Sequence, residues 1–256
     1  YKLWGKIMKQ KTALITGASH GIGKAIAARF ASEGCDLILN CKTDYERLQQ
    51  SARELSDAYG IRTTVIPCDV SDHAAVCDMF AQIRSTYSYS DAGVDILINN
   101  AGISRIGLLT DLSIDDWNRV IATNLSSVFS CCHEAIPYMV HQKSGCIINI
   151  SSVWGSVGAS CEVAYSASKG GVNTFTKALA RELAPSSIRV NAIACGVIDT
   201  RMNGCFDADE RAALEEEIPM GRYGTPNEVA DLAWQLVTAP SYLTGQIISL
   251  DGGWQA

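Results

Sequence analysis

A short apolar stretch at residues 12–16 runs directly into a glycine-rich turn and then into a helical pattern that continues to residue 33. The turn, residues 17–23, reads GASHGIG. Glycines in such a turn let the backbone approach a pyrophosphate closely, and the N-terminus of the following helix favours its negative charge. Because it lies between a strand and a helix, the turn predicts dinucleotide binding. The structural alternative is a tight turn that only packs the helix on the sheet.

The rest of the chain alternates between short apolar runs and longer segments with helical spacing. This order predicts one α/β domain, a Rossmann-type doubly wound parallel sheet of seven strands in three layers, without a second domain. We expect the domain to span residues 8–256, with Met8 as the natural start and residues 1–7 as an addition to it. Further strands are expected at residues 36–41, 63–67, 94–98, 146–150, 188–193 and 246–250, and helices at 44–59, 72–87, 115–140, 164–184, 207–217 and 226–237.

Composition excludes several classes of function. The net charge of −6 argues against a surface for nucleic acid or an anionic membrane, and no run of about 18 apolar residues would span a membrane. The ten cysteines include no Cys-x-x-Cys pair and the four histidines are scattered, so we expect no metal site. Scattered cysteines in a chain of this length indicate free thiols in a reducing cytoplasm rather than a disulfide scaffold.

The end of the expected second strand indicates which dinucleotide is bound. An acid at this place binds the adenosine ribose in NAD-dependent folds, whereas this chain has Asn40, Cys41, Lys42 and Thr43. No carboxylate there repels a 2′-phosphate, Lys42 attracts one, and His20 of the glycine turn is placed to assist. The sequence therefore favours NADP over NAD, with an ordinary surface lysine as the alternative for Lys42.

Polar residues recur at the ends of the next strands. Asp69, which precedes Val70, is expected to accept a hydrogen bond from the adenine amino group, to cap the helix near residues 71–72, or to do both, since the two roles are compatible. The run Asn99-Asn100-Ala101-Gly102 suits a ligand that lies against the sheet. Asn124 lies inside an expected helix, where asparagine is unfavourable. It is either solvated or makes hydrogen bonds that disturb the helix locally.

The stretch 146–171 carries the expected chemistry. Ser152 ends a strand, and Tyr165 and Lys169 share one face of the following helix because they are four residues apart. This set suits acid–base chemistry on a carbonyl or an alcohol. The serine hydroxyl polarises the oxygen, the phenol transfers the proton, and the ammonium makes the phenolate accessible. The tyrosine–lysine pair alone is weak evidence, and the preceding motifs give it weight.

Taken together, these motifs resemble the short-chain dehydrogenase/reductase family over residues 11–253. Residues 16–23 match the family's cofactor turn and residues 99–102 its fourth-strand motif. Asn124, Ser152, Tyr165 and Lys169 match its catalytic tetrad, including the spacing from serine to tyrosine. Segments 219–222, 225–230, 242–246 and 251–253 resemble the 3-oxoacyl-[acyl-carrier-protein] reductase branch.

The resemblance implies an NADPH-dependent reductase that acts on a small-molecule or carrier-bound ketone, as a homotetramer packed through helices 115–140 and 164–184. Tyr165 would be the general acid, Lys169 would lower its pKa and hold the nicotinamide ribose, Ser152 would stabilise the reacting oxygen, and Asn124 would support a water-linked proton relay. The implied cofactor contacts are Gly17, Ser19, His20, Gly21, Ile22, Gly23, Lys42, Asp69, Val70, Asn100, Ala101, Gly102, Tyr165, Lys169, Ile198 and Thr200.

Two departures from the family pattern concern the substrate. Cys195-Gly196 replaces the usual Pro-Gly, which frees the backbone dihedral φ and predicts a more mobile substrate loop. Glu162 stands where carrier-protein reductases often have glutamine; it is expected to attract a cationic substrate or to raise the pKa of Tyr165, or to be a solvent-facing charge. Residues 201–224 are expected to form a lid over the substrate or a surface insertion.

Several substrates remain open at this point. Residues 153–155 and 158–163 resemble a subgroup similar to the reductase of 5-aminopentanone-modified elongation factor P, whose substrate carries an amine. Basic residues for docking an acidic carrier protein are few near the site. Small ketones, sugars and steroids are further alternatives. A non-catalytic dinucleotide sensor is the alternative of a different class, although it would be expected to lack one of the tetrad residues.

Overall fold

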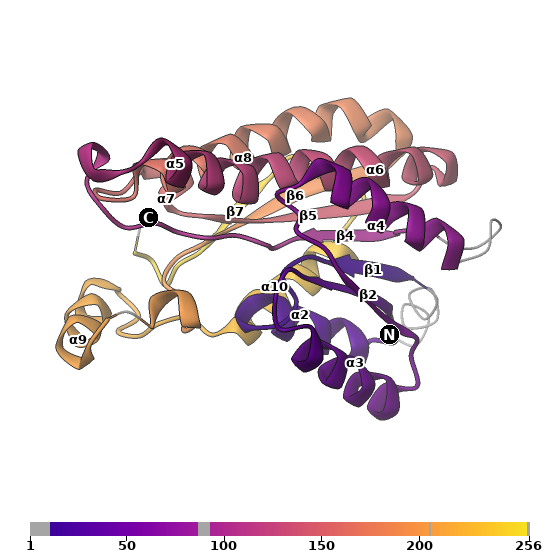
Figure 1. The fold of residues 1–256 in the computed structure, drawn as a ribbon, viewed down its shortest axis with the longest axis horizontal. Coiled ribbons are helices and arrows are strands. Elements are labelled where there is room, and N and C mark those ends of the chain that lie inside the picture. Colours follow the sequence, from indigo (N-terminus) through magenta and orange to yellow (C-terminus); the bar gives the residue numbers. More distant parts are fainter. Residues whose placement is uncertain (1–10, 87–92, 205, 255–256) are drawn as a thin grey trace.

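Seven parallel strands form a sheet in the order β3-β2-β1-β4-β5-β6-β7 at the centre of the computed structural model (Figure 1). The structure describes residues 11–86, 93–204 and 206–254. The order reverses between β1 and β4, where the chain crosses from one half of the sheet to the other. The strands are β1 (Thr12–Ile15), β2 (Asp36–Cys41), β3 (Thr63–Pro67), β4 (Ile96–Asn99), β5 (Gly145–Ser152), β6 (Ile188–Cys195) and β7 (Ile247–Leu250).

Helices cover both faces of this sheet and give the predicted three layers (Figure 1). The helices on one face are α2 (Gly21–Ser32), α3 (Tyr45–Tyr59) and α10 (Pro226–Thr238). Those on the other are α4 (His73–Thr86), α5 (Ile114–Ile121), α6 (Ser127–Gln142) and α8 (Val163–Leu183). The short helix α7 (Trp154–Val157) follows β5, and α9 (Ala208–Glu217) projects beyond the sheet.

The strands read as continuous apolar runs because both faces of the sheet are buried. Successive side chains of β1 point to opposite faces. Ala13 and Ile15 therefore pack in one apolar core with α2 and α10, and Leu14 packs in the other with α4 and α6. No helix in the described ranges combines the length and the apolar character that a membrane crossing requires.

The predicted seven-stranded fold is confirmed, with differences at particular elements. Strands β2 and β3 have the predicted bounds. Strands β5 and β6 are longer than predicted because residues Ser151 and Ser152 still pair with Ala194 and Cys195. The single helix expected at 115–140 is divided into α5, a π-helical turn η2 (Ala122–Ser126) and α6. Met8 lies outside the described residues.

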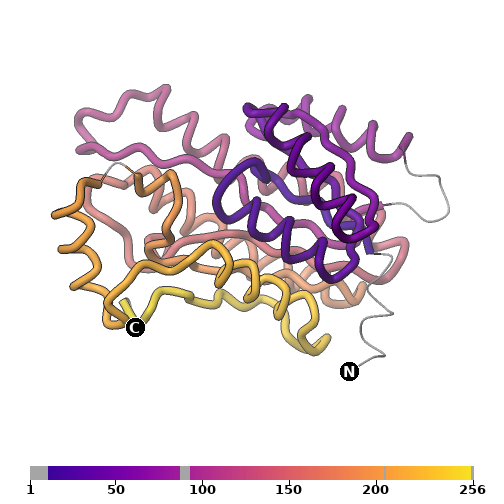
Figure 2. Tube along the Cα trace, turned by 90° about the horizontal axis from the view of Figure 1, so that it is seen from below, coloured from indigo at the N-terminus to yellow at the C-terminus, as the bar shows by residue number. Residues whose placement is uncertain are grey.

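The acidic helix predicted at 207–217 is present as α9. Asp207 begins it with a capping box, in which its side chain accepts hydrogen bonds from the backbone of Asp209 and Glu210. Residues 206–217 are part of the segment 201–224 that is expected to form a lid or a surface insertion, and we call them the lid segment. They lie at the same end of the molecule as the C-terminal segment after β7 (Figure 2). Leu214 and Trp254 pack in one small apolar cluster there. The fold thus brings the two segments together at the carboxyl ends of the strands.

Candidate active site

A cleft of about 1220 Å³ opens at the carboxyl ends of the central strands. This is the position at which parallel α/β sheets bind their ligands. The volume exceeds that of a typical small-molecule site, roughly 300–1,000 Å³, so it has room for a dinucleotide and a second molecule. The predicted residues that line the cleft are Gly17, His20, Gly21, Ile22, Asn100, Ala101, Gly102, Ser152, Glu162, Tyr165, Lys169, Ile198 and Thr200.

The glycine turn is held against the loop after β4. Asn100 donates from its side-chain amide to the carbonyl oxygens of Thr16, at 2.8 Å, and Gly17, at 3.1 Å. The backbone amides of Asn100 and Ala101 each donate to the Thr16 hydroxyl at 3.0 Å. A Cβ atom at Gly23 would lie 2.3 Å from the Gly17 carbonyl oxygen, so only glycine allows this approach. The Asn100 amide therefore shapes the turn.

The first turn of α2 faces the same cleft. Its preceding residue, His20, makes no side-chain bond to the free amides of the helix within the described part of the chain. These amides and the helix dipole suit a negatively charged group. The backbone cradle and the close packing at Gly23 therefore fit the pyrophosphate of a dinucleotide.

Asn124 explains why the long helix is interrupted. The residue is buried, and its side chain accepts from the backbone amide of Ile103 at 2.8 Å and donates to the Ile103 carbonyl oxygen at 2.9 Å. It also donates to Ser168 Oγ at 3.1 Å. The prediction that Asn124 makes hydrogen bonds and disturbs its helix is confirmed, and the solvated alternative is wrong. A Cβ atom at Gly102 would lie 3.4 Å from Asn124 Oδ1 and 3.6 Å from Lys169 Nζ, so these two groups border the same small space beside Gly102.

Lys169 is buried beneath the cleft. Its ammonium donates to the Ile150 carbonyl oxygen at 2.8 Å and lies 5.6 Å from the centre of the Tyr165 ring. Burial lowers the pKa of Lys169 to about 8, against a smaller opposite effect of the Cys195 thiol. The side chain is thus placed beneath the phenol and within reach of a ligand at Gly102.

Burial also dominates the acid–base behaviour of Tyr165. It raises the pKa of the phenol well above its usual value, and Cys195 and Glu162 act in the same direction, whereas a hydrogen bond with Ser152 lowers it. The implied lowering of the Tyr165 pKa by Lys169 does not appear in this structure, where the lowering effect comes from Ser152. The effect expected of Glu162 has the predicted direction. A phenol with a raised pKa stays protonated at neutral pH and can act as an acid.

Ser152 lies at the end of β5, opposite Cys195 of β6. Its hydroxyl oxygen accepts from the backbone amide of Trp154 at 3.2 Å, so its own hydrogen remains available to a neighbouring oxygen. Burial raises the pKa of the Cys195 thiol to about 12, against an opposite effect of Lys169. The residue that replaces the family's proline is therefore a neutral thiol at the floor of the cleft.

The residues expected to recognise the adenosine end are arranged differently from the prediction. Lys42 forms an ion pair with Asp69, with 2.6 Å between Nζ and Oδ2. Asp69 also accepts from the amide and the hydroxyl of Ser71, at 3.1 and 2.7 Å. Burial alone would raise the pKa of Asp69, but hydrogen bonds from Lys42 and Ser71 hold this pKa below its usual value. The helix-capping alternative for Asp69 is wrong, because Asp72 accepts from the Ala74 amide at 2.9 Å.

A carboxylate not counted in the sequence argument lies close to His20. Asp44 Oδ2 is 3.2 Å from His20 Nε2 and 3.9 Å from Arg201 Nη2. Burial lowers the pKa of His20, and the cations Arg201 and Arg47 act in the same direction. The expectation that this region has no acid is therefore corrected, although the region also contains more basic groups than Lys42 alone. Asn40 is buried, and its side-chain amide donates to the carbonyl oxygens of Ile66 in β3 and of Cys68 just after β3.

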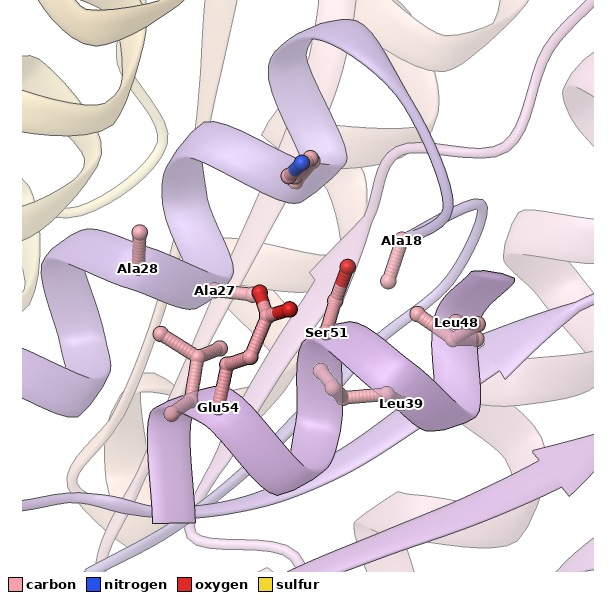
Figure 3. Close-up of a pocket in the computed structure, with 9 residues that line it drawn as sticks. Ala18, Ala27, Ala28, Leu39, Leu48, Ser51 and Glu54 are labelled. Atoms are coloured by element: carbon pink, nitrogen blue, oxygen red, sulfur yellow. The ribbon is translucent and has the colours of Figure 1, made fainter. Parts of the chain in front are cut away.

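A small cavity lies between α2 and α3, away from the cleft (Figure 3). It measures about 60 Å³ and is lined by Ala18, Leu39 and Leu48 among others. This volume holds no more than a few water molecules. The cavity is therefore a packing gap behind the glycine turn.

Glu162 lies in the wall of the cleft, at the start of α8. Its carboxylate accepts from Ser104 Oγ at 2.5 Å. The Cys161 carbonyl oxygen accepts from the backbone amide of Gly107 at 2.8 Å. These bonds join the loop after β4 to the loop before α8. The Glu162 carboxylate is therefore held by Ser104 at the cleft wall, in a half-buried residue.

Sequence reasoning missed several contributors to the site. Ser168 accepts a hydrogen bond from Asn124, and the Thr16 hydroxyl holds the loop after β4. Arg201 reaches Asp44. Trp154 and Trp254 line the cleft. Thr16 belongs to the recognised turn motif and could have been identified there. Trp254 follows the last strand, where no local pattern indicates a site.

The fold, the glycine turn and the serine–tyrosine–lysine arrangement define a nicotinamide-dependent oxidoreductase. The family model of the short chain dehydrogenases matches residues 11–211, and the chain belongs to this family, whose members use NAD or NADP.

Related proteins and solved structures align with nearly the whole chain. The chain is 40% identical over 245 residues to the uncharacterized oxidoreductase YmfI of Bacillus subtilis (strain 168), covering 95% of this chain and 98% of that protein. It is 38% identical to the 3-oxoacyl-[acyl-carrier-protein] reductase FabG of Aquifex aeolicus (strain VF5), covering 96% and 98%. The structure of actinorhodin polyketide ketoreductase with NADPH superposes with a TM-score of 0.89 at 32% identity, covering 97% and 98%.

Proposed function

We propose that this protein is an NADPH-dependent oxidoreductase that reduces a ketone to a secondary alcohol, in the manner of a 3-oxoacyl-[acyl-carrier-protein] reductase. The observation that carries the proposal is the convergence of Ser152, Tyr165 and Lys169 on the cleft that also contains the glycine turn. The glycine turn, residues 100–102 and Lys169 would hold the dinucleotide, which supplies the hydride when bound. The test is the loss of NADPH absorbance when purified protein meets a ketone.

The chain's own residues would handle the carbonyl oxygen and its proton. Tyr165 would donate its phenolic proton to this oxygen, because burial keeps the phenol protonated. Ser152 would donate a second hydrogen bond to the same oxygen, since its own oxygen already accepts from the amide of Trp154. The ammonium of Lys169 would stabilise the phenolate that remains. Asn124, beside Gly102, would border the route by which the proton is replaced.

NADPH is expected to be preferred over NADH, and Lys42 to contribute to the preference. Lys42→Ala is expected to raise the KM for NADPH roughly tenfold and to leave the KM for NADH unchanged, because a charged hydrogen bond to the 2′-phosphate is lost. Steady-state kinetics with both cofactors measure this. Lys11→Ala is the matched control. Lys11 also pairs with an aspartate, Asp95, but it lies before β1, whereas Lys42 follows the carboxyl end of β2. A clear preference of the wild type for NADH would refute the argument.

A ketone that carries an amine, like 5-aminopentanone on elongation factor P, is the second candidate substrate. Glu162 supports it, because this carboxylate lies in the cleft wall that also contains Tyr165. Glu210 and Glu217 of α9 line the same cleft. These carboxylates can attract a cation, in a lining that also contains Arg105 and Arg201. Small neutral ketones, sugars and steroids remain further candidates.

Glu162→Gln separates these substrates. We expect kcat/KM for an aminoketone to fall on the order of tenfold or more, since the charge partner is removed, and kcat/KM for an acetoacetyl thioester to change by less than about threefold. The comparison uses steady-state kinetics with both substrates. Glu216→Gln is the control, because Glu216 lies on α9 outside the cleft lining. Equal effects of Glu162→Gln on both substrates would remove the aminoketone from consideration.

We further propose a homotetramer in the cytoplasm. Exposed apolar side chains on α6 and α8, Phe129 and Val163, support packing of these helices against other subunits. The nine cysteines of the described ranges are free thiols, which suits a reducing compartment.

A further inference from the structure

Two tryptophans lie side by side in the wall of the cleft. The ring centres of Trp154 and Trp254 are 4.8 Å apart, with 62° between the ring planes, which is an edge-to-face arrangement. Both side chains belong to the cleft lining, together with Ser152 and Tyr165. Trp154 begins α7, and its backbone amide is the group that donates to Ser152 Oγ. The indole pair therefore starts immediately beside the residues proposed to bind the carbonyl oxygen.

The second tryptophan connects this wall to the lid segment. Trp254 packs against an apolar cluster of Val197, Ile218 and Tyr223, and Leu214 of α9 packs against the same cluster. Leu214 and Ala213 also line the cleft. The pair is thus one part of a continuous apolar wall that runs from the end of β5 to the lid segment.

The backbone that carries Trp254 has little freedom to yield. Gly252 has a φ of +67°, and a Cβ atom there would lie 2.9 Å from a side-chain carbon of Ile218. A Cβ atom at Gly196 would lie 2.7 Å from the Asp251 backbone. The segment before Trp254 is therefore packed tightly against the loop after β6 and the end of α9. A large group pressed against the indoles meets a braced wall, and overfilling such a wall is unfavourable.

We infer that Trp154 and Trp254 are specificity-determining residues that limit the length of the apolar group on the substrate carbonyl. The inference rests on the proposed reduction of a ketone. A short chain packs against the indole faces, while a longer one collides with the pair and the lid segment. One methylene group in a hydrophobic pocket changes kcat/KM by about 10- to 200-fold. The wall therefore selects short-chain ketones, independently of the charge of Glu162 on another part of the cleft.

The test compares the 3-oxobutanoyl, 3-oxohexanoyl and 3-oxooctanoyl thioesters of N-acetylcysteamine. We expect kcat/KM of the wild type to fall on the order of tenfold or more from the shortest to the longest substrate. Trp154→Val removes most of one indole, and Trp254→Phe keeps a ring against the lid cluster. Each is expected to raise the ratio of longest to shortest substrate by about tenfold. The matched control is Trp117→Phe on α5, outside the cleft lining, which should leave the ratio unchanged.

The outcomes separate this inference from the proposed function. A wild type that reduces all three thioesters with similar kcat/KM overturns the inference and leaves ketone reduction standing, whether or not the variants fold. A wild type that binds NADPH but reduces no ketone overturns both. Circular dichroism and NADPH titration report whether the variants are folded. Folded variants that bind NADPH and keep the wild-type ratio also overturn the inference.

Discussion

Replacing Tyr165 by phenylalanine is expected to lower kcat for ketone reduction by about 10²- to 10⁴-fold, the usual contribution of a positioned general acid. The phenol is the group that shares a hydrogen bond with Ser152 and lies over the ammonium of Lys169. Phenylalanine keeps the ring and removes only the transferable proton. NADPH binding is therefore expected to change by less than about threefold.

Stopped-flow measurement of NADPH oxidation gives kcat, and fluorescence titration gives the dissociation constant of NADPH. The control is Tyr45→Phe on α3, whose hydroxyl accepts a hydrogen bond from Gln49 on the surface. It removes the same atom far from the chemistry and should leave kcat at the wild-type value. Near-normal turnover by Tyr165→Phe would rule out the proposed general acid. A wild type that binds NADPH but shows no turnover would instead favour the non-catalytic dinucleotide sensor.

Replacing Lys169 by methionine is expected to lower kcat by about 10²-fold or more and to weaken NADPH binding. Methionine keeps a long apolar stem but removes the ammonium that donates to the Ile150 carbonyl oxygen. Loss of this buried partner is expected to destabilise the fold by about 1–3 kcal/mol, offset in part because a buried charge is also removed. Urea unfolding and NADPH titration measure the two effects. Lys177→Met, on an exposed position of α8, is the control.

The pH dependence gives an independent test of Lys169. Its pKa is lowered by burial to about 8, so activity that needs the ammonium should decline as pH rises above about 8. In the unfolded chain Lys169 has a pKa of 10.5. Between pH 8 and 10.5 its side chain therefore binds more protons in the unfolded chain than in the folded chain. Stability should therefore rise with pH across this window, and Lys169→Met should remove the rise. A wild-type kcat/KM that stays flat well above pH 8 would contradict this assignment.

Local patterns were sufficient for the fold class. Strands β2 and β3 were predicted with their exact bounds because a buried parallel strand is a short, uninterrupted apolar run. The glycine turn was recognisable because close backbone approach at Gly23 excludes every other residue type. Asn124 was recognisable for the opposite reason, since it is an unfavourable residue in a long helix. Its buried bonds to Ile103 account for the π-helical turn.

Contacts between distant segments were beyond such patterns. Lys42 was correctly placed after β2, but only the parallel pairing of β2 with β3 brings it to Asp69. Asp44 reaches His20 because the turn after β1 and the start of α3 meet at one edge of the cleft. Glu162 was recognised as unusual, and the fold then decided that it faces the cleft with Ser104. In each case the partner is set by the packing of whole elements.

The amino-acid sequence alone thus determined the parallel sheet, the dinucleotide turn and the serine–tyrosine–lysine set, since each depends on neighbours along the chain or on one helix face. The tertiary structure alone decided the acid–base state of that set and the shape of the substrate wall. Burial moves the pKa values of Tyr165 and Lys169 in opposite directions. Trp254 reaches Trp154 only because the preceding strand β7 pairs with β6, the neighbour of β5. Burial and long-range packing are properties of the assembled layers.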